Sequence, residues 1–249
     1  MNKFRPSCRE DIPALRRLWQ EAFGDSGEYL DLFFGTAYAP QRSRVLERDG
    51  IAGAAYWLDC RVKDFRLAYV YAVAIDRTLQ NQGLGSALMK ELHSHLKLLG
   101  YDGILLVPGD EGLRSYYSKL GYETVSWQDR FTASAGTWVP MTRLDTTSYA
   151  DLRRNYLGEM GVIQEGENLA LLGKMADFFH GDAFLAAVAP GEGECLELLG
   201  DISAAPGITA ALGLKVCTFR TPGNAHPYAM AHSLGRELPK TLYFGFGFE

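Results

Sequence analysis

The chain has 249 residues, of which 47% are hydrophobic and 22% are charged, and its formal net charge is −5. This composition is typical of a globular protein of one or two domains with a sizeable buried core. The negative balance disfavours nucleic acid and anionic membranes as partners and is compatible with a cationic amine substrate. There is no run of 18 apolar residues and no leader-like N-terminus, so we expect a cytoplasmic protein without a membrane span.

The cysteines and histidines predict neither a disulfide nor a metal site. The four cysteines are scattered without a C-x-x-C pair, which is typical of reduced, mostly buried thiols. His93 and His95 are two positions apart, a spacing that cannot place both on one face of a helix. The other three histidines are distant in the sequence, so we expect no metal.

The first 75 residues predict an initial strand, two helices and then three further strands. Asp11, Ile12 and Pro13 combine an N-cap residue with a proline in the first helical turn, and an apolar stripe follows them. Asp49-Gly50 is a strong hairpin dipeptide between two strand-like runs. The next run is almost continuously apolar, as in a strand that is buried on both faces. These patterns predict helices near 12–23 and 30–38 and strands at 44–48, 51–58 and 67–75.

A glycine-containing loop, Gln-Asn-Gln-Gly-Leu-Gly-Ser at 80–86, follows this buried strand and opens a helix over 83–99. Leucines recur every four residues along that helix and mark its buried face. Gly83 and Gly85 therefore lie in the first turn, where backbone N–H groups have no intrahelical partner and the helix dipole favours an anion. Glycine also lets another molecule approach these amides closely. The loop is predicted to bind a phosphate group.

The spacing of this loop excludes two common phosphate motifs. It is not the G-x-x-x-x-G-K-[ST] pattern of nucleotide-binding P-loops, nor the three-glycine fingerprint of dinucleotide folds. Beyond it, the sequence predicts a helix end at Gly100, a strand at 103–107, a helix at 110–120 and a strand at 122–125.

Two motifs in this half resemble the GNAT superfamily of acyl-CoA-dependent N-acetyltransferases. Gln80, Gly83 and Gly85 match its pyrophosphate loop, [QR]-x-x-G-x-[GA]. Residues 113–122, Leu-Arg-Ser-Tyr-Tyr-Ser-Lys-Leu-Gly-Tyr, resemble its second signature, Y-x-K-x-G-[FY]. The predicted order β-α-α-β-β-β-α-β-α-β is also the GNAT order. The resemblance covers about residues 3–144 and implies a mixed α/β GNAT fold.

The resemblance implies acetyl-CoA as co-substrate and a primary amine as acceptor, which attacks the thioester directly in a ternary complex. Tyr117 corresponds to the family's general acid, with Tyr116 as the alternative if the helix register differs. The strand before the loop contains no carboxylate, so the general base stays open among Asp59, Asp110 and the terminal carboxylate of Glu249. The expected CoA-binding residues are Val73, Ala74 and Ile75 on the strand and Gln80, Asn81, Gln82, Gly83, Leu84, Gly85 and Ser86 in the loop.

The second half reads as an abbreviated, degenerate GNAT-like domain, with the boundary between residues 1–145 and 146–249. Ala204-Ala205-Pro206-Gly207 stands where a phosphate loop would be, and proline removes a donor there, so we expect no acyl-CoA in this half. A short segment at 140–144 and another at 229–234 are expected to close the first and second halves respectively. The predicted elements are helices at 149–160 (capped by Ser148), 169–179 (capped by Asn168) and 206–213, a hairpin of 184–189 with 195–199, and strands at 216–220, 228–232 and 241–248.

Together these patterns predict a cytosolic GNAT-type acetyltransferase whose second domain shapes or covers the acceptor site. Alternatives are a catalytically idle acyl-CoA-binding module, a transferase with a longer acyl donor, and a tandem relative that uses charged tRNA, which the acidic balance disfavours. The acceptor is open among small amines, antibiotics, peptides and protein termini, and a homodimer stays open as an assembly.

Overall fold

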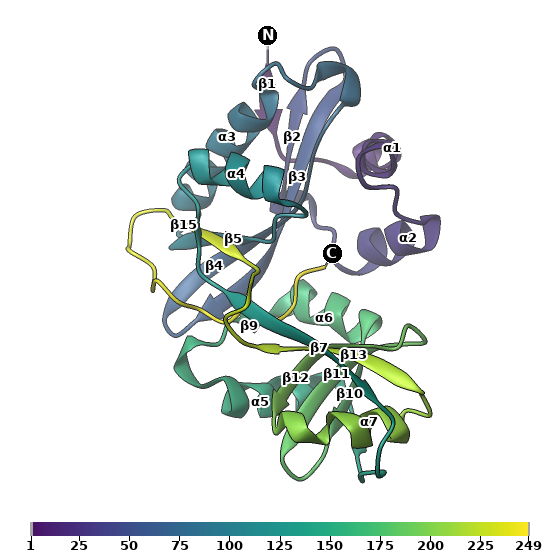
Figure 1. The fold of residues 1–249 in the computed structure, drawn as a ribbon. Coiled ribbons are helices and arrows are strands. Elements are labelled where there is room, and N and C mark those ends of the chain that lie inside the picture. The colour runs from purple at the N-terminus through teal and green to yellow at the C-terminus, as the bar shows by residue number, and fades with distance from the viewer. Residues whose placement is uncertain (1, 249) are drawn as a thin grey trace.

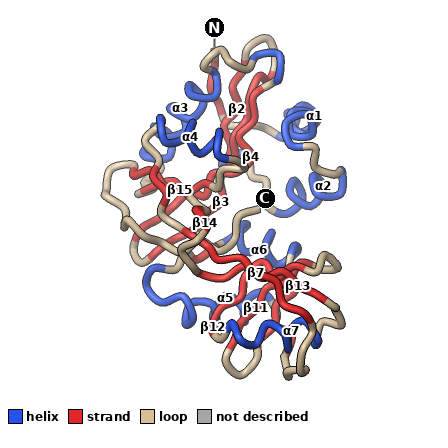
Figure 2. The backbone as a smooth tube through the Cα atoms, in the orientation of Figure 1, coloured by secondary structure: helices blue, strands red, loops and turns tan. Residues whose placement is uncertain are grey.

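A computed structural model describes residues 2–248 as two mixed β-sheets with helices on their faces (Figures 1 and 2). The first sheet has the strand order β1-β2-β3-β4-β5-β15-β6, with β9 beside β3, and the second has the order β14-β7-β13-β12-β11-β10-β8. The strands of the first sheet are β1 (Lys3–Arg5), β2 (Ser43–Glu47), β3 (Ile51–Val62), β4 (Phe65–Ile75), β5 (Gly103–Leu106), β6 (Glu123–Thr124), β9 (Ile163–Gln164) and β15 (Met230–Ser233). Those of the second are β7 (Trp127–Ser134), β8 (Thr142–Leu144), β10 (Asp177–His180), β11 (Phe184–Ala189), β12 (Glu194–Gly200), β13 (Val216–Pro222) and β14 (His226–Pro227).

Seven α-helices cover these sheets in the described part of the chain. The helices α1 and α2 lie on one face of the first sheet and α3 and α4 on the other, while α5 and α6 separate the first sheet from the second (Figure 1). The helix α7 covers the outer face of the second sheet. Their bounds are α1 (Ile12–Phe23), α2 (Gly27–Thr36), α3 (Leu84–Leu98), α4 (Glu111–Lys119), α5 (Thr146–Leu157), α6 (Gly166–Met175) and α7 (Ala205–Ala211).

The elements predicted for the first 125 residues are all present within a few residues of their expected bounds. The hairpin forms at Asp49-Gly50, where both residues adopt the positive φ that such a turn requires. Gly24, Gly100 and Gly121 end their helices or turns in the left-handed region. Mixed α/β architecture with the GNAT order is confirmed.

The two halves exchange strands, which the sequence did not indicate. The strand β7 leaves the first half and pairs antiparallel with β13 from Gln128↔Pro222 to Ser134↔Val216 in the second sheet. In return, β15 from the C-terminal part inserts between β5 and β6 of the first sheet. The segments expected to close their own halves therefore lie elsewhere: β8 is at the edge of the second sheet and β15 is inside the first. A domain boundary at residue 145 stays a prediction, but the sheets do not follow it.

The second half also differs from its predicted elements in detail. Asp145, not Ser148, caps α5, because its carboxylate accepts a hydrogen bond from the Ser148 N–H. The helix α6 begins before Asn168 and ends at Met175, and Phe178 and Phe179, which the apolar spacing predicts on that helix, lie on β10. The spacing at 169–179 fits both a helix and a strand, and sheet pairing decided between them.

Residues 242–248 are mostly buried, but the segment 241–248 does not form the predicted strand. An isolated bridge joins Tyr243 to Gly161, and three backbone N–H groups donate to side chains: Phe244 to Ser126 Oγ, Gly247 to Tyr228 Oη and Phe248 to Tyr69 Oη. The aromatic side chains pack into the core between the two sheets. The expectation that this segment is packed is confirmed, whereas its assignment as a strand is wrong, because its backbone N–H groups bond side chains and loop carbonyls instead of a neighbouring strand.

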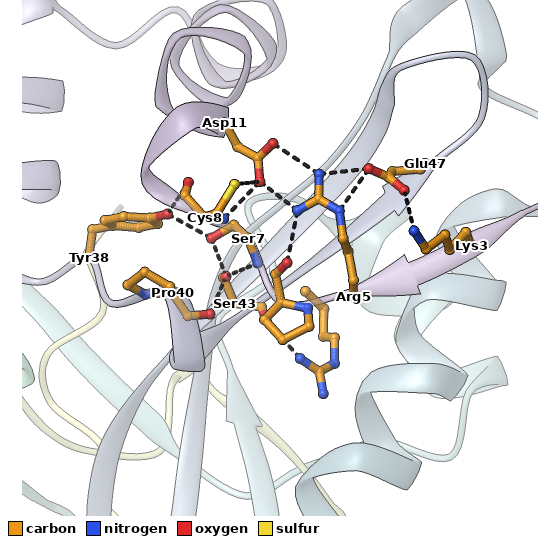
Figure 3. A network of polar contacts seen from close by, with 11 residues as sticks. Lys3, Arg5, Ser7, Cys8, Asp11, Tyr38, Pro40, Ser43 and Glu47 are labelled. Atoms are coloured by element: carbon orange, nitrogen blue, oxygen red, sulfur yellow. Dashed lines mark hydrogen bonds and ion pairs between the residues drawn. The ribbon is translucent and has the colours of Figure 1, made fainter.

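The chain start is fixed to the first sheet by a polar network (Figure 3). Asp11 accepts from Arg5 Nη1 at 2.6 Å and from the Cys8 backbone N–H at 2.8 Å, and Arg5 Nε also donates to Glu47 at 2.7 Å. Asp11 occupies the N-cap position of α1, as predicted, but its side chain bonds these groups rather than the first turn of the helix. The network orients α1 over β3 and β4. None of the described helices is both long and apolar enough to traverse a lipid bilayer.

Candidate active site

The strands β4 and β5 separate in the middle of the first sheet. They pair in parallel only from Leu67↔Gly103 to Tyr69↔Leu105, and neither strand pairs with the other beyond that point. On its other side β4 stays paired with β3, where the register shifts between Tyr56↔Tyr71 and Ala54↔Ala74. The extra residues form a bulge with Ala72 at a φ of +51°, a conformation that non-glycine residues seldom adopt. An opening therefore lies between β4 and β5 beyond Tyr69 and Leu105, and the cavity lining includes β4 residues 69–73 and Leu106 of β5.

The helix α3 begins beside the end of β4 with an open N-terminus. Its N-cap residue, Gly83, has a φ of +77° and gives no side-chain cap, and the first turn contains no acidic residue. A Cβ atom added at Gly83 would meet nothing within 4 Å, so its surface is accessible. The first backbone N–H groups of α3 are thus exposed together with the positive end of the helix dipole. This geometry fits an anionic group such as a pyrophosphate.

Side chains hold this loop in place. Gln80 Nε2 donates to the Ile75 carbonyl at 3.2 Å, and Arg48 Nη1 donates to Gln82 Oε1 at 2.8 Å. Asn81 adopts a positive φ of 61°. Gly85 packs under the Tyr116 hydroxyl, which a Cβ atom would approach to 3.1 Å. The predicted loop residues therefore have a defined backbone, and Arg48 adds a positive charge beside it.

The two tyrosines of the second motif point to different places. The Tyr116 hydroxyl lies 3.3 Å from Ser86 Oγ, against the start of α3. Tyr117 is 8% exposed and lines the cavity beyond the β4–β5 opening. Burial raises the pKa of the Tyr117 phenol well above its ordinary value, and the adjacent Tyr116 adds to this increase. Tyr117 is thus a protonated hydroxyl at neutral pH, in the place where the motif predicts a general acid.

The cavity has a volume of about 730 Å³ and lies between the two sheets. The first sheet contributes β4 and β5, the second contributes β7 and β13, and Phe248 of the C-terminal segment reaches the same space. Among the predicted site residues, the cavity lining includes Val73 and Tyr117 but not Ala74, Ile75 or the loop 80–86. The loop therefore lies outside the cavity and follows the end of β4, whose residues 69–73 line the cavity.

Two carboxylates named as alternatives for the general base have structural partners outside this cavity. Asp59 pairs with Arg42 at 2.9 Å and also accepts from Tyr101. Asp110 caps α4 by accepting from the Leu113 N–H at 2.7 Å. Neither lines the cavity. The third alternative, Glu249, lies outside the described residues.

The structure brings further polar residues into the cavity that sequence reasoning missed. Asp25, in the turn between α1 and α2, accepts from Trp19 Nε1 at 2.6 Å. Gln128 and Arg130 come from β7, and Arg220 comes from β13. Alternating polar and apolar residues at 130–134 could have indicated β7 as a strand, but nothing local indicated that it joins the second sheet. For Asp25, a turn position between two helices is an ordinary solvated place and gave no signal.

Comparison with known proteins decides the family of the first half. The sequence profile of the Acetyltransferase (GNAT) domain matches residues 3–125. Residues 3–125 are therefore a GNAT acetyltransferase domain. No match was found among curated protein sequences.

Solved structures similar over both halves show that the GNAT domain is followed by a second, GNAT-like domain. A GCN5-related N-acetyltransferase from Kribbella flavida is 14% identical, with a TM-score of 0.72 over 94% of this chain and 72% of that chain. One from Anabaena variabilis ATCC 29413 is 11% identical, with a TM-score of 0.72 over 94% and 73%. Eis1 from Mycobacterium abscessus is 11% identical, with a TM-score of 0.68 over 94% and 74%. At these identities the likeness concerns the fold.

Proposed function

We propose that this GNAT protein transfers an acetyl group from acetyl-CoA to a primary amine by direct attack. The observation that carries the proposal is the combination of an open α3 N-terminus, the β4–β5 opening and a buried tyrosine hydroxyl along one path. Each part answers one requirement of the reaction: an anchor for phosphate, a channel for an extended thiol-bearing arm, and a proton donor.

The chain's own residues can hold the acetyl donor as the reaction requires. The exposed N–H groups at Gly83–Ser86 would bind the pyrophosphate, and the unpaired edge of β4 near Val73 would accept and donate hydrogen bonds along the pantetheine arm. The bulge at Ala72 turns the β4 backbone at this edge, so that an N–H group is available to polarise the thioester carbonyl. The neutral amine then attacks that carbonyl, and the carbon–sulfur bond breaks.

Tyr117 is the proposed general acid for the departing thiolate. A free thiol has a pKa of about 8.5, so a neighbouring proton donor eases its departure at neutral pH. The position of Tyr117 in the cavity lining supports this role, and its phenol carries a proton at neutral pH. The amine must lose a proton before or during attack. Asp25 and His226 supply the titratable carboxylate and imidazole among the described cavity-lining residues.

Tyr117→Phe tests the assignment because it removes the hydroxyl and keeps the ring. General acid catalysis contributes about 10²–10⁴-fold, so we expect kcat to fall at least tenfold while CoA affinity changes little. Thiol release from acetyl-CoA, measured across a panel of amines, gives the rate, and calorimetric titration gives the CoA affinity.

Tyr116→Phe is the matched control, since its hydroxyl contacts Ser86 and does not line the cavity. It should retain kcat. A Tyr117→Phe variant with the wild-type rate, under conditions where chemistry limits turnover, would mean that the acid is elsewhere. CoA binding without turnover of any amine would favour an idle acyl-CoA-binding module.

A further inference from the structure

The side chains that the second domain contributes to the cavity lining include two arginines, whereas those from the GNAT domain are mainly apolar and aromatic. Gln128 and Arg130 alternate along β7 with Phe131 and Ala133, which pack toward α7 on the opposite face. Arg220 is the direct cross-strand partner of Arg130 on β13. The strand exchange described above therefore places two guanidinium groups on one wall of the acceptor cavity.

These two arginines share one carboxylate oxygen. Arg130 Nη2 donates to Glu194 Oε1 at 2.6 Å, and Arg220 Nε donates to the same atom at 2.9 Å. Burial by itself would raise the pKa of Glu194, but Arg220 and Arg130 outweigh it and hold the pKa below its ordinary value. Glu194 is thus a fixed negative charge that orients the guanidinium of Arg130.

Arg130 is the accessible member of this pair. Its side chain is 53% exposed, compared with 12% for Arg220. Within residues 2–248, Glu194 is the one acceptor that bonds Arg130, so most of its five N–H donors face the cavity or solvent. A guanidinium that is oriented on one side and open on the other is suited to a planar, bidentate anion such as a carboxylate.

The GNAT domain contributes the complementary charge to the cavity lining. Asp25 is the single carboxylate among the described residues that line the cavity. It is held by Trp19 Nε1, and the aromatic rings of Trp19, Tyr71 and Phe248 line the space beside it. Carboxylate and aromatic faces both attract an ammonium group, and the rings also bury an apolar body.

We propose that the acceptor is an amino-acid-like zwitterion, whose carboxylate binds Arg130 and whose amine enters from the side of Asp25. This proposal rests on the proposed function, because it names the class of amine that the GNAT domain acetylates. The second domain then has a direct task in recognition, because it supplies the exposed guanidinium of Arg130. The GNAT domain also lines the cavity with Arg114, but Arg114 Nη2 already donates to the carbonyls of Pro227 and Tyr228.

The test compares acceptors that differ only in the carboxylate. The panel contains phenylalanine, tyrosine, leucine and lysine, each with its C-terminal amide and its decarboxylated amine. The amides are the less basic amines and would react more readily if no group bound the carboxylate. We expect instead that at least one free acid has a kcat/KM ten or more times that of its amide, mainly through a lower KM.

Arg130→Gln should lower kcat/KM for that acid about 10- to 100-fold, as expected for the loss of a charged hydrogen bond, and should remove its advantage over the amide. Arg143→Gln is the matched control, because Arg143 is also an exposed arginine of the second sheet that pairs with one carboxylate, Asp177, away from the cavity. It should leave the ratio of acid to amide unchanged.

The outcomes separate the two proposals. Amides acetylated as well as their acids, or an Arg130→Gln variant that slows acids and amides equally, would overturn the zwitterion proposal and leave the acetyltransferase function standing. Turnover of no amine at all, in a protein that binds CoA, would overturn both.

Discussion

The helices α3 and α7 both follow a strand, but the first turn of α3 is exposed, whereas the first turn of α7 is covered by another part of the chain. At α3, a Cβ atom on Gly83 would meet nothing within 4 Å. At α7, a Cβ atom on Gly207 would come within 2.5 Å of Val139 Cγ1 and 2.8 Å of the Thr137 carbonyl. The segment between β7 and β8 thus covers the start of α7, where the first half leaves the corresponding backbone exposed.

Two further features close the second unit. Pro206 has no N–H to offer an anion, and its carbonyl accepts from the Gly136 N–H at 2.9 Å, which ties the covering segment down. The strands β12 and β13 pair in parallel at Glu194↔Thr218 and Cys195↔Phe219. A helix that follows a strand therefore does not make an anion site by itself. Its first turn must also be left uncovered by the rest of the chain.

The second half also contributes to the first half: β15 pairs in the first sheet, and residues 241–248 pack against its core. The largest expected effect comes from removing residues 241–249. Burial of a large apolar side chain contributes about 1.5–3 kcal/mol, so losing several of them would be comparable to the whole stability of a domain. We expect insoluble protein or a strongly lowered melting temperature in thermal unfolding. The side chains lost from the core include Leu242, Phe244, Phe246 and Phe248.

Phe244→Leu gives the milder form of the same test, since Phe244 is fully buried and contacts the Tyr69 ring. It should lower the melting temperature and keep the protein soluble. Leu98→Ala changes an exposed side chain and serves as the control. A soluble truncated protein with the wild-type melting curve would show that the first half does not depend on this segment.

The open start of α3 predicts a selective loss of binding. Gly83→Glu places a side chain and a negative charge at the exposed amides, so CoA affinity should fall beyond detection, at least 100-fold, in a folded protein. Such a loss follows if the anion depends on close approach to the backbone and on the positive end of the helix. Calorimetric titration with CoA measures it.

Gly100→Glu is matched to that variant. Gly100 follows the same helix at its other end, has the same φ of +77° and likewise has nothing within 4 Å of its Cβ position. The two variants therefore carry the same backbone strain, of about 1–2 kcal/mol, but Gly100→Glu should keep the wild-type CoA affinity. Equal affinities in the two variants would contradict the phosphate assignment.

A smaller effect is expected at the contact of β15 with the GNAT domain. His93 on α3 stacks on His232 of β15 with ring centroids 4.4 Å apart, and its Nε2 lies 2.8 Å from the Tyr122 hydroxyl. Burial, with a further contribution from His232, lowers the pKa of His93 from 6.5 to about 4. Between these two pH values His93 is protonated in the unfolded chain and neutral in the folded protein. The free energy of unfolding therefore falls as the pH falls from about 6.5 toward 4.

His93→Gln removes this titrating group and should weaken the dependence of the melting temperature on pH between 7.5 and 5. Glutamine can still form a hydrogen bond with Tyr122. The variant and the wild type should differ most at the acidic end of the series. Identical slopes would indicate that other groups set the acid stability of the interface between the halves.

Local patterns in the sequence determined most of the GNAT domain. The Asp49-Gly50 turn between two strand-like runs indicated β2, β3 and their hairpin, because a turn signal acts over a few residues. The four-residue leucine period and the glycines at 83 and 85 placed an open helix start after a buried strand. The second motif predicted Tyr117 as the acid, with Tyr116 as the alternative if the helix register differed. Tertiary structure places Tyr117 in the cavity lining and packs the Tyr116 hydroxyl against Ser86.

Tertiary structure decided what lies between the two halves. The pairing of β7 with β13 joins residues about 90 positions apart. The strand β15 comes after all strands of the second sheet in the sequence, yet it pairs with β5 in the first sheet. No local propensity encodes such partners, because a strand fits any edge that matches its buried face. The phosphate loop and the tyrosine, by contrast, belong to short local motifs, so the sequence indicated them. The charged wall with Arg130, the position of Asp25 and the course of residues 241–248 followed only from the assembled fold.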